Sequence, residues 1–497
     1  MPARPIRVKF KNELGSSTTL PEGEQYLRLH GQGRDALVTC PGPRPGLCAP
    51  LLAGSGCVYL LSVSEFERQM PPDWRLAIPS EWRHVSMEEA RALLPGVRVL
   101  HYTPATRLLP SVYAPLLAMR RPASGARTAA AVWLPCPEAG LVVPELEHAA
   151  HAMKLTPRRL PASLSPNELT RLLDRETPDL FLSVNFHGLD PWGENQALLE
   201  AAAVPAAVWC VDNPLHLLTG QKNQLWKKLP LFVTDDWFVE PLRALGADAR
   251  HLPLAASPHF FGPGAVCPGG KDLTFAGRSS FPDRDRFFAA CRLPEDLAKE
   301  ARGLPGRRAH FGWWRDRLPD LPLWPGNGVR TLGLGAETAS AAWRRDCLAA
   351  LSATMDLTII GDEAWQTLVP SARHLPPVDY YNGLAGAYRK ASFTLNLTSL
   401  LLPGGLTQRH FDVWACGGFL ITDDTPGLSI FPQDMAQAVA FETPQQAAEL
   451  LRGLAGEPER KEGLRRAWQD LILSRHTYEA RLRSILASCH ADRVTTS

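Results

Sequence analysis

Short apolar stretches alternate with amphipathic helical segments from residue 129 to residue 255. The expected strands are 129–135, 180–186, 206–212, 231–236 and 249–255, and the expected helices between them are 144–155, 165–176, 194–203 and 238–245. Apolar strands separated by helices form a parallel sheet, because each crossover needs a helix to return the chain. The pattern therefore predicts one Rossmann-like domain.

The same alternation resumes after residue 271. The expected strands are 272–278, 355–362, 391–398, 417–423 and 438–443, and the expected helices are 338–353, 382–391, 444–451 and 481–488. This pattern predicts a second parallel sheet. The segment 310–326, with three tryptophans and several prolines, interrupts it and is interpreted as a rigid structural loop, with stacking on a sugar as the alternative.

Two stretches rich in Gly, Pro or polar residues, 120–128 and 260–271, predict a linker and a hinge. The resulting domains are an extension at 1–125, a Rossmann-like domain at 126–262 and a second one at 263–497. Within the extension, 57–63, 74–79 and 97–104 are expected strands, and 86–94 is an expected helix that opens with a Ser-x-x-Glu capping box. The extension suits acceptor recognition, partner docking or simple packing.

Composition narrows the class of protein. With 53 basic and 51 acidic residues the formal charge is +2 and no long charged run occurs, so nucleic acid is not the expected partner. The ten cysteines are scattered without a CxxC pair, which predicts neither zinc nor disulfides and favours the cytoplasm. No apolar run is long enough for an integral membrane segment. No cofactor motif is complete, because a dinucleotide fingerprint and a P-loop each lack a required residue.

The stretch 408–427, QRHFDVWACGGFLITDDTPG, is the main candidate for chemistry. Arg409 and Asp412 lie three apart on an expected helix, and Gly417 and Gly418 end that helix before a short apolar strand. The guanidinium of Arg409 would bind phosphate oxygens, and the carboxylate of Asp412 would accept hydrogen bonds from ribose hydroxyls. The alternative is an ordinary surface ion pair between these two side chains.

These residues also carry a resemblance to a known family. RHFDVWACGGFLITDDTPGL (409–428), SRHTYEARLRSIL (474–486) and VWCVDNP (208–214) resemble the CgeB-like (spore maturation protein) branch of group 1 glycosyltransferases. The resemblance covers residues 130 to 490 and implies a GT-B architecture, in which two Rossmann-like domains face a cleft and the C-terminal one binds a nucleotide-activated sugar. Asp412 stands where the family usually has Glu, and Gly404 stands where the first Glu of the wider Glu-x7-Glu pattern is found.

The remaining donor-site candidates follow expected strands or precede the helix. Gly277, Arg278 and Ser279 would bring backbone amides and a cation to the diphosphate, although Arg278 could also be a solvated loop residue. The other members are Asn396 and Thr398, at an L-N element that the family shares, and Gly404, Gly405 and Thr407. A buried Asn that holds a loop and a glycine turn are the structural alternatives for this second set.

Two residues on the N-terminal side of the expected cleft are candidates for the acceptor or for proton transfer. His187 follows one expected strand, and Asp212 follows the next and matches the aspartate of the family's W-x-x-D-x-P element. A structural role for the histidine is the alternative. The Asp pairs 235–236 and 423–424 each end a strand and lack the spacer of a DxD motif, so no metal site is expected.

The sequence thus predicts a cytoplasmic, retaining and metal-independent glycosyltransferase of α/β fold and GT-B type. Its partners would be a nucleotide-sugar donor and a protein, glycan or small-molecule acceptor, and no cofactor is expected. A catalytically inactive protein of the same fold and a nucleotide-sugar epimerase are the two alternatives.

Overall fold

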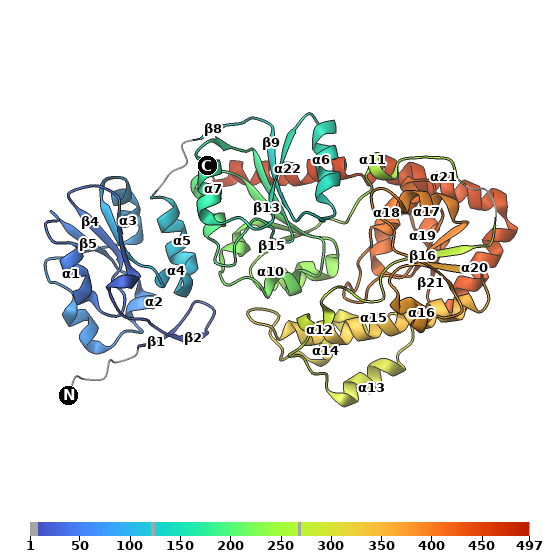
Figure 1. Cartoon of the computed structure of the whole chain (residues 1–497), viewed down its shortest axis with the longest axis horizontal. Coiled ribbons are helices and arrows are strands. Elements are labelled where there is room, and N and C mark those ends of the chain that lie inside the picture. Colours follow the sequence, from blue (N-terminus) through green and yellow to red (C-terminus); the bar gives the residue numbers. More distant parts are fainter. Residues whose placement is uncertain (1–7, 121–124, 267–269, 497) are drawn as a thin grey trace.

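The computed structural model of the protein describes residues 8–120, 125–266 and 270–496. Figure 1 shows three α/β units in a row, with the N-terminal extension at one end and the C-terminal sheet at the other. Residues 121–124 of the expected linker and 267–269 of the expected hinge lie outside the described residues. The two boundaries between the three domains stay a prediction.

The N-terminal extension contains a five-stranded mixed sheet of order β3-β7-β4-β5-β6. Its strands are β3 (Leu27–His30), β4 (Ala36–Cys40), β5 (Val58–Leu61), β6 (Arg83–Val85) and β7 (Arg98–Tyr102), with β3 antiparallel to β7. A hairpin, β1 (Lys9–Lys11) with β2 (Ser17–Thr19), precedes them, and the helices are α1 (Cys48–Leu51), α2 (Ser64–Glu67), α3 (Met87–Leu93), α4 (Ala105–Leu108) and α5 (Pro110–Ala118). The expected capping box is present at the start of α3.

One expected strand of the extension is wrong. Residues 74–79 belong largely to a 3₁₀ helix, Pro72–Ala77, that begins at a proline. Proline fixes φ near the helical value at the start of such a turn. The apolar residue Trp74 is buried, and its indole nitrogen donates a hydrogen bond of 2.9 Å to the Gly42 carbonyl.

The first Rossmann-like unit is an all-parallel sheet of order β10-β9-β12-β13-β14-β15. Its strands are β9 (Ala131–Cys136), β10 (Thr156–Pro161), β12 (Leu180–Val184), β13 (Ala206–Cys210), β14 (Pro230–Val233) and β15 (Asp248–His251). Its helices are α6 (Val143–Ala152), α7 (Pro166–Leu173), α8 (Glu194–Ala201), α9 (Pro214–Leu218), α10 (Val239–Ala244) and α11 (Pro258–Phe261), and a small pair, β8 (Ala126–Arg127) with β11 (Glu176–Thr177), lies beside it. The sequence did not predict β10, whose two prolines and two arginines are tolerated because it is an edge strand.

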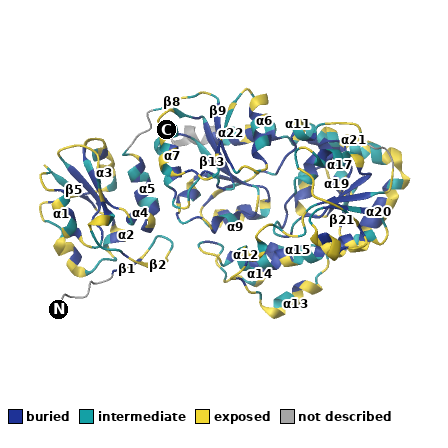
Figure 2. Ribbon diagram, viewed as in Figure 1, coloured by how far each residue is buried: buried dark blue, intermediate teal, exposed yellow. Residues whose placement is uncertain are grey.

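The second unit is also an all-parallel six-stranded sheet, of order β18-β17-β16-β19-β20-β21. Its strands are β16 (Leu273–Ala276), β17 (Leu357–Ile360), β18 (Arg373–Leu375), β19 (Phe393–Asn396), β20 (Leu420–Asp423) and β21 (Ala440–Phe441). Its helices are α12 (Arg284–Phe287), α13 (Glu295–Gly303), α15 (Val329–Ser352), α16 (Ala364–Leu368), α17 (Leu384–Lys390), α18 (Arg409–Ala415), α19 (Gln433–Gln437), α20 (Pro444–Gly456) and α21 (Pro458–Arg475). Figure 2 shows that the central strands of both sheets are buried. The predicted fold class, two Rossmann-like parallel sheets with an N-terminal α/β extension, is confirmed.

The segment 310–326 is not a loop throughout, which corrects the prediction. Residues Phe311–Arg317 form helix α14, and Trp313, Trp314 and Trp324 are buried against the core of the first Rossmann-like unit. The apolar face of α15 continues this contact at its N-terminal end and joins the core of the second sheet at its C-terminal end. Helix α15 therefore packs on the cores of both units and fixes the position of one sheet relative to the other.

The last helix, α22 (Tyr478–Thr496), returns to the sheet of the first Rossmann-like unit. It lies against α6 and β13, and Figure 1 shows it behind the strands of that sheet. An isolated bridge between Ala256 and Thr477 marks the point where the chain crosses back. No helix in the described part of the chain combines the length and the apolar composition that a membrane crossing requires.

Candidate functional site

The loops at the carboxyl ends of the two sheets meet each other. Asn213 follows β13, and its side-chain amide donates to the Leu401 carbonyl at 3.0 Å. Asp235 follows β14, and its carboxylate accepts a hydrogen bond of 2.9 Å from the Gly404 amide. In open α/β sheets, ligands bind outside the carboxyl ends of the strands. The polar side chains at this junction are therefore the candidate site.

Arg409, at the start of α18, is held at the carboxyl edge of the second sheet. Its Nε donates to Asn396 Oδ1 at 2.8 Å, and its Nη1 donates to the Ala276 carbonyl at 2.8 Å. No hydrogen bond joins its second terminal nitrogen, Nη2, to any residue in the described ranges, and the residue is partly exposed. A guanidinium fixed in this way presents an oriented donor to an anion.

Asn396 connects Arg409 to three threonines. Its carbonyl oxygen also accepts from the Thr407 hydroxyl at 2.8 Å, and its amide donates to the hydroxyls of Thr398 and Thr422 at 3.0 Å each. The structure thus brings four of the predicted residues, Arg409, Asn396, Thr398 and Thr407, into one hydrogen-bonded network. The sequence named each of them, but it gave no sign that they are bonded to one another.

Asp423 is the buried centre of this network. Its carboxylate accepts hydrogen bonds from the Thr398 amide and hydroxyl, both at 2.9 Å, and from the Trp343 indole at 3.2 Å. It also pairs with Arg307 at 2.9 Å, and the Asp423 side chain is 1 % exposed while that of Arg307 is 11 % exposed. The amide and hydroxyl of Thr398, predicted to bind the donor, are therefore already used within the protein.

Asp412 is enclosed, and the surface ion pair with Arg409 is not formed. Its carboxylate is 1 % exposed and accepts hydrogen bonds from the Tyr380 hydroxyl at 2.5 Å and from the Gln408 amide at 3.0 Å. Burial raises the pKa of Asp412 well above its usual value. The aspartate side chain is short, so its carboxylate stays close to the helix, where these two neighbours cover it. Its predicted contact with ribose remains a prediction.

The loop after β16 lies beside Arg409. A methyl group added at Gly277 would lie 3.7 Å from Arg409 Nη1. Arg278 is exposed, whereas the Ser279 amide and hydroxyl both donate to Asp362, at 2.7 and 2.8 Å. The sequence missed Arg344 of α15, whose Nη2 donates to the Ser279 carbonyl at 3.1 Å and which places a second cation next to this loop.

Gly404 and Gly405 lie in the loop that contacts the first unit. The Gly404 amide donates to Asp235, the Gly405 carbonyl accepts from the Thr425 hydroxyl at 3.3 Å, and the predicted role of both glycines at the donor stays a prediction. A side chain at position 404 would begin 3.1 Å from a carboxylate oxygen of Asp235 and 3.3 Å from one of Asp236. A glutamate at position 404 would be repelled by these two carboxylates, and this repulsion explains why a glycine is found there.

Asp235 carries a pH-dependent contribution to stability. Burial raises its pKa from 3.8 to about 6, although the Trp237 and Gly404 amides favour the charged form. Because the folded pKa exceeds the unfolded value, this contribution is complete below pH 3.8 and is lost as the pH rises through 6. We expect the unfolding free energy of the wild type, relative to Asp235→Asn, to fall by about 3 kcal/mol between about pH 4 and pH 7. Urea titrations of both proteins measure it, and a difference that does not change with pH would contradict it.

A cavity of about 310 Å³ lies between the two sheets and contains the two predicted N-terminal residues. His187 and Asp212 line it, and Asn185 donates to the Asp212 carboxylate at 2.7 Å. Burial lowers the pKa of His187, and Asp212 offsets this in part, so the imidazole is neutral near pH 7 and can accept a proton. Its Nδ1 is buried and without a partner in the described part of the chain.

The backbone around this cavity adopts unusual conformations. Asn185 and Phe186 have positive φ values of 54° and 65°, and Val142 on the opposite wall has a φ of 76°. Bulky residues rarely adopt this region, and such conformations cluster at ligand sites. Here they turn the chain sharply after β12, which directs Asn185 and His187 toward the cavity.

Glu145 is a cavity residue that the sequence did not predict. Its side chain is 1 % exposed, one oxygen accepts from the Tyr381 hydroxyl at 2.8 Å, and the other has no partner in the described ranges. Burial raises its pKa, and the hydrogen bond from Tyr381 lowers it in part. The sequence signal that could have identified Glu145 as a site residue is its position in the first turn of the helix after β9, because such turns lie at the carboxyl edge of a parallel sheet.

Comparison with known proteins defines the class of this chain. Residues 344–487 match a family model described as glycosyl transferase-like, and this match contains Arg409, Asn396, Thr398 and Asp412. The protein therefore carries a glycosyl transferase-like domain, and its enzyme class is that of the glycosyltransferases. The sequence matches no curated protein.

Several solved structures are similar in outline. The T4 phage β-glucosyltransferase is 8 % identical, over 72 % of this chain and 98 % of that one, with a TM-score of 0.39. Anabaena Alr3699/HepE in complex with UDP-glucose is 7 % identical, over 73 % and 99 %, with a TM-score of 0.43. A glycosyltransferase from Rickettsia africae is 8 % identical, over 73 % and 98 %, with a TM-score of 0.41. Similarity at this level does not define a substrate.

Proposed function

We propose that this protein transfers a sugar from a nucleotide-sugar donor to an acceptor hydroxyl, with retention of configuration and without a metal ion. The observation that supports the proposal most is the fixed guanidinium of Arg409. It lies at the carboxyl edge of the second sheet, inside the glycosyl transferase-like match, with one nitrogen unpaired among the described residues. The finer assignments, the CgeB-like branch and a cytoplasmic location, belong to the same proposal.

The chemistry explains why a cation is needed there. The acceptor oxygen forms a bond to the anomeric carbon of the sugar while the bond from that carbon to the diphosphate oxygen breaks, and the electron pair leaves with the diphosphate. Arg409 would stabilise the charge that grows on this leaving group. Arg278 lies in the loop after β16, and Arg344 donates to the carbonyls of Arg278 and Ser279 in that loop, so both cations could assist. Gly277 leaves room beside Arg409, because it has no side chain to fill that space.

The cavity between the two sheets would receive the reacting hydroxyl. Neutral His187, the carboxylate of Asp212 and the departing diphosphate are the groups that could take the proton of the acceptor. The 310 Å³ of this cavity is at the lower end of the range of small-molecule sites. It therefore suits a single sugar ring or the end of an acceptor better than a whole nucleotide.

One observation favours a non-catalytic protein of the same fold. Asp412, in the place of the family's ribose-binding glutamate, is covered by Tyr380 and Gln408. A protein that had lost donor binding would need no accessible carboxylate at this position. The choice between the two candidates depends on whether donor binds and reacts.

A donor screen tests the proposal. Nucleoside diphosphate sugars with different bases and sugars are added to the full chain, and thermal unfolding and donor hydrolysis are measured. A true donor present at about a hundred times its dissociation constant should add about 2.7 kcal/mol of stability and should be hydrolysed slowly without acceptor.

Three outcomes of the screen would change the proposal. Absence of hydrolysis and transfer with every donor, whether or not a donor stabilises the protein, favours the non-catalytic protein, and an altered sugar in the recovered donor favours an epimerase. Activity should also persist in EDTA. Its complete loss on chelation, reversed by Mg²⁺ or Mn²⁺, would show that the metal-independent mechanism is wrong.

A further inference from the structure

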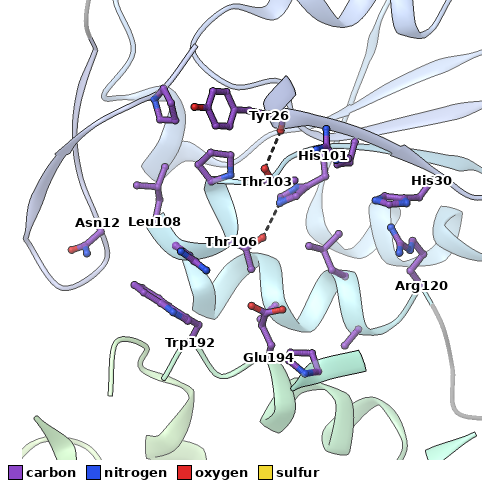
Figure 3. Close-up of a pocket in the computed structure, with 18 of the residues that line it drawn as sticks. Asn12, Tyr26, His30, His101, Thr103, Thr106, Leu108, Arg120, Trp192 and Glu194 are labelled. Atoms are coloured by element: carbon purple, nitrogen blue, oxygen red, sulfur yellow. Dashed lines mark hydrogen bonds between the residues drawn. The ribbon is translucent and has the colours of Figure 1, made fainter. Parts of the chain in front are cut away.

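A second and larger cavity, of about 900 Å³, lies between the N-terminal extension and the first Rossmann-like unit. Figure 3 shows that side chains of both units line it. The extension and the second sheet are at opposite ends of the molecule in Figure 1, so this cavity is remote from Arg409. Its volume lies within the range of sites for small organic ligands.

The two walls of the cavity are held together by packing and hydrogen bonds. Helix α5 of the extension packs on α8 through a small apolar cluster of Ala114, Ala118, Ala197 and Leu225. The Glu13 carboxylate accepts hydrogen bonds of 2.9 Å from the amides of Ser111 and Gln224, which belong to different units. The cavity is therefore part of the folded structure and does not require a ligand to form it.

The floor of the cavity carries an aromatic ring and a carboxylate on either side of a glycine. Trp192 and Glu194 flank Gly193, whose positive φ of 75° turns the chain into α8. Neither the Trp192 indole nitrogen nor the Glu194 carboxylate has a hydrogen bond to a residue in the described ranges. Figure 3 shows the Glu194 side chain directed from the first Rossmann-like unit toward Thr106 of the extension, and the Trp192 ring directed to the side where Leu108 lies.

The negative charge of Glu194 at the floor of the cavity is partly balanced by the positive charge of Arg107. Burial and the nearby Asp190 raise the pKa of Glu194, and Arg107 lowers it in part. The Arg107 guanidinium lies over the Trp192 ring, 5.6 Å from its centre. Arg28, another cavity residue, already donates to the carbonyls of Gln25 and Leu27. Arg120, the third arginine of the cavity, also has an interaction within the protein. All three arginines therefore have a partner within the protein.

The opposite wall offers neutral hydrogen-bonding groups. No residue in the described part of the chain bonds to the Tyr26 hydroxyl or to the side-chain nitrogen of Asn12, whose oxygen accepts from two amides of its own turn. An apolar side wall is formed by Leu108, Leu117 and Leu198. The groups of this cavity that lack a hydrogen bond to a described residue thus include the Glu194 carboxylate, the Arg107 guanidinium and the neutral donors of Trp192, Tyr26 and Asn12, next to an aromatic and an apolar surface.

This combination matches an uncharged saccharide. A pyranose ring has an apolar face of C–H groups, which packs on aromatic rings, and a rim of hydroxyls, which donate strongly to a carboxylate. We propose that this cavity binds an uncharged segment of a saccharide chain, which belongs to the acceptor and is held at a distance from the transfer centre. Its identification as part of the acceptor rests on the proposed function, whereas binding itself does not.

Direct titration tests the site without any transfer reaction. The full-length protein is titrated, by calorimetry and by saturation-transfer NMR, with uncharged trisaccharides of glucose, galactose, mannose and N-acetylglucosamine. At least one should bind. Its dissociation constant should rise at least about tenfold in Glu194→Gln and in Trp192→Ala, because each removes one of the two main contacts. Glu200→Gln, an exposed change on the same helix, is the matched control and should bind as the wild type does.

The outcomes separate this proposal from the proposed function. Failure of all four trisaccharides to bind, or equal binding by Glu194→Gln and Trp192→Ala, overturns the saccharide site. Donor hydrolysis should be the same in Glu194→Gln and in the wild type, and a fall would show that the cavity is not separate from the transfer centre. Absence of donor hydrolysis in every protein would refute the transferase function while the trisaccharide titrations still report on the cavity.

Discussion

Arg409→Ala is expected to lower the rate of sugar transfer by about 10²- to 10³-fold, because one fixed donor to a developing oxyanion contributes on that scale. Binding of the nucleoside diphosphate should weaken less, since the contact strengthens as the leaving group gains charge. Steady-state kinetics of transfer or of donor hydrolysis, together with calorimetric titration of the nucleoside diphosphate, measure the two effects.

Two variants control this experiment. Arg409→Lys keeps the charge but loses the planar group that bonds to Asn396 and Ala276 together, so it should recover only part of the rate. Arg345→Ala removes an exposed arginine of α15 that pairs with its neighbour Asp346, and it should leave the kinetics unchanged. Equal rates for Arg409→Ala and the wild type would remove the main support for the transferase function.

Asp423→Ala is expected to have the largest effect on stability. The substitution leaves Arg307, whose side chain is only 11 % exposed, without its carboxylate partner, and it removes the acceptor of the Thr398 amide, the Thr398 hydroxyl and the Trp343 indole. Breaking a buried ion pair from one side costs about 3 to 5 kcal/mol. Urea unfolding measures the loss, and a variant too unstable to purify is consistent with it.

An exposed ion pair provides the comparison. Asp346→Ala removes the partner of Arg345 on the surface of α15 and should change the unfolding free energy by less than about 1 kcal/mol. A loss as small as this in Asp423→Ala would show that the network around Asn396 does not depend on the buried carboxylate.

The fold was predictable where the sequence pattern is local and strong. The buried central strands of both sheets are continuous apolar runs, and the helices between them are amphipathic, so their order along the chain was evident. The edge strand β10 was missed because its arginines and prolines give no apolar run. Helix α14 was missed because its tryptophans are buried by residues of the other unit rather than by their own neighbours in sequence.

The candidate site was predictable by residue type but not by contact. Arg409, Asn396, Thr398 and Thr407 were all proposed from the sequence, and all four belong to one network. Glu145 was not proposed, because a glutamate in the first turn of a helix is ordinary until a cavity is found beside it.

The sequence by itself determined the two parallel sheets, the helices that cover them and the polar residues at the carboxyl ends of the strands. Each of these depends on residues close together in the chain. Only the tertiary structure decided which polar groups remain available to a ligand. The Gly404 amide is taken by Asp235 of the other sheet, and Asp412 is covered by Tyr380, because hydrogen-bond partners are chosen by distance in space, which the local pattern does not encode.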